Sequence, residues 1–170
     1  APRYAERGVG AYIWADGRAY IDCVSALGAV ILGYLHPEVE YAVREQLTRG
    51  VSFSLPTRLE GELAERLVAG LPKGDWQCRF GKNGTEVVSR AVRLARAHTG
   101  RDRLVMYRTG YHGSEDWSMT RPPRNGGVPD DVRRLIVLVE AFDLEDIARA
   151  MKAYEPAAIV LEAVVSTDPV

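Results

Sequence analysis

The sequence predicts an α/β fold in which a mostly parallel sheet carries helices on both faces, preceded by an N-terminal β-hairpin and helices. Two observations predict this fold. Apolar and polar residues alternate around an Asp-Gly pair near the N-terminus, and from residue 73 onward short apolar runs alternate with helical patterns. The 170 residues suffice for one domain with a core and a small appendage.

The N-terminal third is expected to contain one hairpin and two helices. The stretch "AYIWADGRAYIDCV" alternates on both sides of Asp16-Gly17, the dipeptide typical of a two-residue hairpin turn. Residues 36–50 place apolar side chains at helical spacing between a proline and a glycine, so they predict a helix. Residues 58–72 predict a second helix, with four leucines on one face: Leu59, Leu63, Leu67 and Leu71.

The remaining chain has the rhythm of strand-helix-strand units. The runs "WQCRF", "RLVMY", "RLIVLV" and "AAIVLEAVV" predict strands, and residues 85–98 and 144–154 predict helices between them. This alternation favours a parallel sheet that is covered on both faces. The connector Thr109–Asp131 is too long for a routine turn, and such connectors in compact domains are usually functional.

Composition restricts the class of partner. Lys and Arg number 22 against 23 Asp and Glu, so the near-zero net charge gives no sign of nucleic acid or of a membrane surface. Cys23 and Cys78 are expected on buried strands, and their spacing fits neither a metal site nor a disulfide framework. No apolar run approaches the roughly 20 residues of a membrane span, and the N-terminal stretch lacks a signal-peptide core. A cytoplasmic location is therefore expected.

The first candidate binding feature is the stretch "FGKNGTEVV". A strand ending at Phe80, a turn through Gly81 and Gly84, and a helix starting near Thr85 would leave unpaired N–H groups at the carboxyl end of a strand. These donors and the helix dipole favour an anion such as phosphate. The alternative is a plain helix start, in which the side chain of Asn83 or Thr85 caps the first turn.

Two further candidate features lie after later strands. Tyr111 and His112, in "TGYHGSEDW", follow a strand at the sheet edge where open α/β sheets bind ligands. The ring could stack on a flat heterocycle, or both residues could simply pack on the surface. Glu162 ends an otherwise apolar strand, and because burying an unpaired carboxylate is costly, it needs a partner or faces a site.

Five segments in order carry a family resemblance: "GAYIWADGRAYIDCVSALGAVILGYLHPEV", "LPTRLEGELAERLV", "RFGKNGTEVVSRAVRLARAHTGRDRLV", "GYHG" and "IVLEAVV". The chain resembles the N-terminal portion of class III aminotransferases, fold-type I enzymes that depend on pyridoxal 5′-phosphate (PLP), nearest to the glutamate-1-semialdehyde aminomutase branch. The resemblance implies that residues 1–72 form an N-terminal arm and residues 73–170 the first part of the PLP-binding major domain.

The resemblance also implies roles for residues. The turn Asn83, Gly84 and Thr85 would hold the PLP phosphate, Tyr111 would stack on the pyridine ring with His112 beside it, and Glu162 would lie near the polar edge of the ring. Three residues of the arm would lie near the substrate entrance: Ser54, Leu55 and Pro56. The sequence departs from the family at Tyr34, where a histidine is usual, and at Ala26, where a glycine is common.

The implied activity moves an amino group between an amine or amino acid and a carbonyl compound, both small molecules, in a homodimer. No catalytic residue is expected within these 170 residues, because Lys73, Lys82 and Lys152 do not match the family's lysine that forms a Schiff base with PLP. The chain is therefore expected to be a fragment of an enzyme and inactive by itself. The alternative is a naturally short, non-catalytic protein of this fold that serves as a binding or assembly partner.

Overall fold

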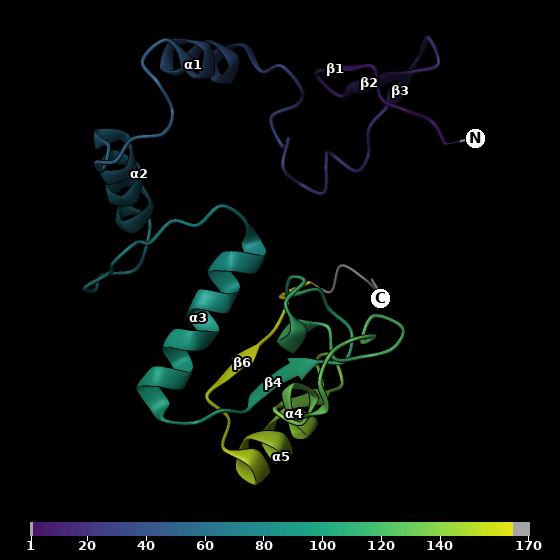
Figure 1. Cartoon of the computed structure of the whole chain (residues 1–170), viewed down its shortest axis with the longest axis vertical. Helices are drawn as coiled ribbons and strands as arrows, with labels where there is room; N and C mark the ends of the chain where they lie inside the picture. Colours follow the sequence, from purple (N-terminus) through teal and green to yellow (C-terminus); the bar gives the residue numbers. More distant parts are fainter. Residues whose placement is uncertain (1, 165–170) are drawn as a thin grey trace. The chain divides into compact units, whose positions relative to one another are not determined.

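The computed structural model describes residues 2–164 (Figure 1). The chain divides into two compact units, residues 1–73 and residues 74–170. The first unit holds an antiparallel sheet of order β1-β2-β3, and the second holds a parallel sheet of order β5-β4-β6.

The first unit begins with the antiparallel strands β1 (Arg7–Val9), β2 (Tyr12–Ala15) and β3 (Arg18–Ile21). Asp16 and Gly17 join β2 to β3 with φ angles of 52° and 68°, the left-handed values that a two-residue hairpin turn requires. The predicted hairpin is confirmed. Strand β1 was not predicted, because three residues are too few to show an alternating pattern.

Tyr34 links the segment that follows the hairpin to the hairpin itself through hydrogen bonds. Its backbone exchanges two hydrogen bonds of 2.9 Å with Gly10, and its hydroxyl donates to Asp22 Oδ2 at 2.6 Å. A Cβ on Gly8 would come within 2.5 Å of the Tyr34 ring, so only glycine allows this packing. The tyrosine that departs from the family pattern thus holds the segment between residues 22 and 34 in a closed loop.

Two helices complete the first unit. Helix α1 (Pro37–Leu47) begins with a proline at its first position, and helix α2 (Arg58–Ala69) begins with a capping box between Thr57 and Glu60. Both predicted helices are confirmed, although Leu71 lies beyond the end of α2. Neither helix contains a buried residue, and their apolar positions are about half exposed.

The second unit is the predicted sheet with a helix on each face. Strand β4 (Leu104–Tyr107) lies between β5 (Ile136–Val139) and β6 (Ala158–Val160), and both neighbours run parallel to it. Helix α3 (Gly84–Thr99) precedes β4, and helix α5 (Leu144–Tyr154) connects β5 to β6.

All four residues of β4 are buried, and they divide the core into two halves. Val105 and Tyr107 pack with Val139 and with Ala150 of α5 on one face of the sheet. Two other β4 residues pack on the opposite face, together with one residue of α3 and one of the connector: Leu104, Met106, Val92 and Trp117. Figure 1 shows α3 and α5 on opposite sides of β4. The predicted fold class is confirmed.

Three expectations about the strands are wrong. Residues 76–80 ("WQCRF") form no strand, because no strand of the described chain pairs with them. Cys23 is exposed and Cys78 is partly exposed, and neither lies in a strand. A short apolar run predicted the strand at residues 76–80, but a strand also needs a partner.

The connector after β4 is more structured than its composition suggests. It contains a short 3₁₀ helix, η1 (Asp116–Ser118), and ends at the short helix α4 (Asp130–Arg133). Trp117 of η1 is buried in the core, and its Nε1 donates a hydrogen bond of 3.1 Å to Ser89 Oγ on α3. The connector is therefore anchored to α3 in the same unit.

Candidate functional site

The start of α3 leaves two backbone donors without a partner. The side chain of Asn83 caps the helix, accepting a hydrogen bond of 2.9 Å from the Glu86 N–H. Within the described residues, nothing accepts a hydrogen bond from the N–H groups of Gly84 or Thr85. Both sequence-based interpretations of this turn therefore hold. Asn83 caps the helix through the N–H of Glu86, and this leaves the N–H groups of Gly84 and Thr85 as donors.

A basic hollow of about 620 Å³ lies beside this turn. It is lined by Asn83 and Thr85, by Ser114 and the Glu115 carboxylate of the connector, and by the cations Lys82 and Arg93, so cations outnumber carboxylates. A third cation of the lining, Arg90, is neutralised by an ion pair with Glu86. Free N–H groups at a helix start and nearby cations together favour a bound anion.

The loop after β4 lies directly on the first turn of α3. Gly110 and Gly113 have φ angles of +132° and +107°, which side chains other than glycine rarely allow. A Cβ on Gly113 would lie 2.9 Å from Thr85 Oγ1 and 3.0 Å from Thr85 Cα. The structure thus brings Tyr111 and His112, which lie between these glycines, to the same place as the turn at Gly84 and Thr85.

His112 and Glu162 approach the same point of this loop. A Cβ on Gly110 would lie 3.2 Å from His112 Nε2 and 3.4 Å from Glu162 Oε2. His112 is only 8% exposed, and its Nε2 has no hydrogen-bond partner among the described residues. Glu162 follows the end of β6 and is partly buried, as its place in the sequence suggested.

The surroundings of His112 favour its neutral form. Burial holds the pKa of His112 below its ordinary value of 6.5, and the nearby Arg121 cation lowers this pKa further. The Glu162 carboxylate acts in the opposite direction. A neutral imidazole can accept a hydrogen bond at one nitrogen while it donates one at the other.

The Tyr111 side chain remains half exposed, unlike His112 next to it. Its ring makes no contact with another aromatic ring of the described chain. An exposed ring in a loop that contacts the helix start through Gly113 is available to pack against a flat ligand.

The three predicted entrance residues belong to the first unit. Ser54, Leu55 and Pro56 are exposed and line a hollow of about 420 Å³ there. The cluster described above lies entirely in the second unit. Among residues 2–164, no helix is long and apolar enough to cross a membrane, and no cluster of metal-ligating side chains occurs.

Sequence reasoning missed two residues of the site. Gly113 was not assigned a role, although its position two residues after Tyr111 in "GYHG" could have suggested one. Arg121, whose charge acts on His112, lies in a connector rich in proline and glycine, and nothing in the sequence distinguishes it from the other arginines there.

Comparison with known proteins identifies the family of the chain. The family model "Aminotransferase class-III" matches residues 1–167. A glutamate-1-semialdehyde 2,1-aminomutase from Thermus thermophilus is 39% identical, over 96% of this chain and 41% of the relative. The chain thus spans about two fifths of the length of the curated relatives it matches.

Solved structures give the same result. An omega-transaminase from Sphaerobacter thermophilus superposes with a TM-score of 0.90 at 33% identity, over 99% of this chain and 43% of that one. A transaminase with PLP bound superposes with a TM-score of 0.89 at 29% identity, again over 99% and 43% of the two chains. Since the family model matches nearly every residue, the chain belongs to the class-III aminotransferase family.

Proposed function

We propose that these residues form the N-terminal part of a PLP-dependent aminotransferase or aminomutase, which moves an amino group between an amine or amino acid and a carbonyl compound. One observation carries the proposal. The glycine-flanked loop that bears Tyr111 and His112 lies on the helix start where the N–H groups of Gly84 and Thr85 have no partner in the described chain.

The residues present fit PLP. Its phosphate is an anion, and it matches the free N–H groups of Gly84 and Thr85, the Thr85 hydroxyl and the basic hollow beside them. Its pyridine ring is flat, and it matches the half-exposed ring of Tyr111. The buried Nε2 of His112, which has no partner in the described chain, is a polar atom still able to bind a ligand.

The residues of the proposed PLP site have distinct roles. Bound PLP supplies an electron sink for the carbon that carries the amino group. The turn at Asn83, Gly84 and Thr85 would hold the phosphate, and the Tyr111 ring would pack against the pyridine ring. His112 and Glu162 form the polar wall behind the loop, where the neutral imidazole can accept or donate a proton at Nε2. We assign no catalytic lysine to this chain.

The test is made on the full-length protein. PLP is titrated in, and the absorbance of the bound cofactor is followed; then an amine donor and a keto-acid acceptor are added and the new keto acid is measured. We expect saturable PLP binding and amino transfer. A full-length protein that binds no PLP at millimolar concentration would contradict the proposal and favour a non-catalytic binding or assembly role.

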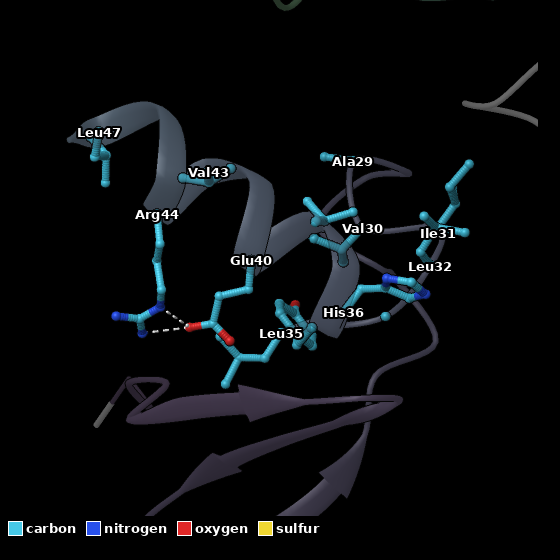
Figure 2. A pocket seen from close by; sticks show the side chains of 13 residues that line it. Ala29, Val30, Ile31, Leu32, Leu35, His36, Glu40, Val43, Arg44 and Leu47 are labelled. Atoms are coloured by element: carbon cyan, nitrogen blue, oxygen red, sulfur yellow. Dashed lines mark hydrogen bonds and ion pairs between the residues drawn. The ribbon is translucent and has the colours of Figure 1, made fainter. Parts of the chain in front are cut away.

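We also propose that the protein acts as a homodimer, because the first unit exposes more apolar side chains than the surface of a soluble monomer normally does. Leu27 is 93% exposed and Ile31 is 81% exposed. Figure 2 shows Val30, Leu35 and Val43 around a pocket of about 600 Å³, with the ion pair between Arg44 and Glu40 at its side. Such a surface suits burial against a second copy related by a two-fold axis.

A further inference from the structure

We propose that Arg121 is a positioning residue of the PLP site: its guanidinium holds the carbonyls of Arg108 and Gly110 and thereby fixes the loop that carries Tyr111 and His112. The inference rests on the proposed PLP site, and it assigns a task to a residue outside the turn and the loop that form it.

Arg121 contacts the backbone of the loop through both terminal nitrogens of its guanidinium. One terminal nitrogen of its guanidinium donates to the carbonyl of Arg108, and the other donates to the carbonyl of Gly110 at 2.9 Å. Within the described residues Arg121 forms no ion pair, so its charge is directed at the backbone. The neighbouring Arg124, by contrast, is exposed, and its side chain makes no contact that would fix it within the described residues.

The carbonyls of Arg108 and Gly110 lie just after the end of β4, where the hydrogen bonds between strands stop. The N–H of Arg108 still donates to Val139 of β5 at 2.7 Å, but the chain then turns away from the sheet through Gly110. A planar guanidinium with two parallel N–H groups can hold two carbonyls that are two residues apart, whereas the ammonium of a lysine is a single point charge. Arg121 thus bridges the bend at which the loop leaves β4.

This bridge acts on both sides of the site. Beyond the Gly110 carbonyl, the loop continues through Tyr111 and His112 to Gly113, which lies against Thr85. The Arg121 cation also disfavours a second positive charge on His112, while Glu162 is the group that favours it. Loss of Arg121 would therefore loosen the loop and also make the imidazole easier to protonate.

Three variants of the full-length protein separate these effects. Arg121→Gln removes the charge and the paired donors, Arg121→Lys keeps the charge but removes the fork, and Arg124→Gln is the matched control in the same connector. For each protein, the dissociation constant of PLP is measured by fluorescence, and the histidine titration is followed by NMR with the His112 signal assigned from a His112→Gln spectrum.

We expect Arg121→Gln and Arg121→Lys to weaken PLP binding about tenfold or more, the factor expected when a charge-assisted hydrogen bond is lost. We expect Arg124→Gln to bind as the parent protein does. The pKa of His112 should rise in Arg121→Gln and stay near the parent value in Arg121→Lys, because only the first variant loses the charge. If the pKa of His112 rises in Arg121→Gln but not in Arg121→Lys, the cause is the lost charge, because both variants lose the paired donors and would loosen the loop alike.

The outcomes also separate this inference from the proposed function. If the parent protein binds no PLP, the proposed function fails, and the His112 titration still tests whether Arg121 faces the imidazole. If the parent binds PLP and both Arg121 variants bind it within twofold of the parent, the positioning role is wrong. If Arg121→Gln does not fold, Arg121→Lys decides by the same twofold criterion.

Discussion

At the scale of single residues, Tyr111 offers the sharpest test of the ring-binding role. Its side chain is half exposed, and the loop that carries it contacts the start of α3 through Gly113. We predict that Tyr111→Ala in the full-length protein weakens PLP binding about five- to tenfold, because stacking contributes about 1 kcal/mol beyond burial. Tyr111→Phe keeps the ring and should bind within about twofold of the parent. Unchanged binding in the alanine variant would make Tyr111 a packing residue only.

The pH dependence of stability should carry the signature of His112. Its pKa lies below 6.5 in the folded protein, so the unfolded chain takes up this proton first as the pH falls. Stability from this group is therefore complete above about pH 6.5 and is lost as the pH falls from there toward the folded-state pKa.

We predict that urea unfolding of the parent protein shows a larger loss of stability between about pH 7.5 and pH 5.5 than unfolding of His112→Gln does. Subtracting the stability loss of His112→Gln from that of the parent removes the contribution of carboxylates that titrate in both proteins. If both proteins lose the same stability over this interval, the imidazole is not held neutral in the fold.

At the scale of elements, the start of α3 combines a cap with a binding turn. The Asn83 side chain accepts from Glu86 N–H, which leaves the donors of Gly84 and Thr85 for a ligand. We predict that Asn83→Ala lowers the free energy of unfolding by about 1 kcal/mol, while Asn83→Ser, which also caps, changes it by much less. Chemical denaturation measures both variants. Equal losses in the two would show that the side chain does not act as the cap.

The contact between the loop and α3 can be broken at Gly113. A Cβ there would lie 2.9 Å from Thr85 Oγ1, on a backbone with φ +107°. We predict that Gly113→Ala costs about 1–3 kcal/mol of stability and weakens PLP binding, because the loop must shift away from the helix start. Gly126→Ala is the control, since a Cβ at Gly126 meets open space. Similar thermal unfolding and PLP affinity in both variants would contradict the described contact.

The same elements show what the sequence could predict. The Asp-Gly turn, the capped helices and the parallel strands β4, β5 and β6 follow from local patterns, and the structure contains them. Residues 76–80 have the same local pattern and form no strand, because pairing depends on neighbours that local residues do not encode. Arg121 escaped notice for a related reason: its partners are backbone carbonyls, which leave no mark on the sequence.

At the scale of the whole molecule, both edges of the parallel sheet are open within the described residues. An apolar hollow of about 430 Å³ lies between α3 and β6, lined by Val88, Ala91 and Ile159 among others. Parallel sheets normally bury both faces and protect their edges. We predict that residues 1–170 expressed alone aggregate or bind PLP weakly, and that they show no amino transfer. Turnover by this segment, abolished by replacing Lys82 or Lys152, would show that a lysine of this chain is catalytic after all.

The exposed apolar surface of the first unit belongs to the same scale. We predict that Ile31→Asp weakens self-association of the full-length protein at least about tenfold, because it places a charge in a surface that needs an apolar partner. Glu62→Asp on α2 introduces the same side chain at an exposed polar position and should leave the dimer intact. Sedimentation velocity over a range of concentrations measures both. A parent protein that is an active, PLP-loaded monomer would refute the dimer.

The central claim is that the start of α3 binds the phosphate of PLP beneath the loop of Tyr111 and His112. A crystal structure of the full-length protein with PLP tests it most directly. We predict phosphate oxygens within hydrogen-bond distance of the N–H groups of Gly84 and Thr85, with the Tyr111 ring against the pyridine. A PLP phosphate bound at any other place in the protein would contradict it.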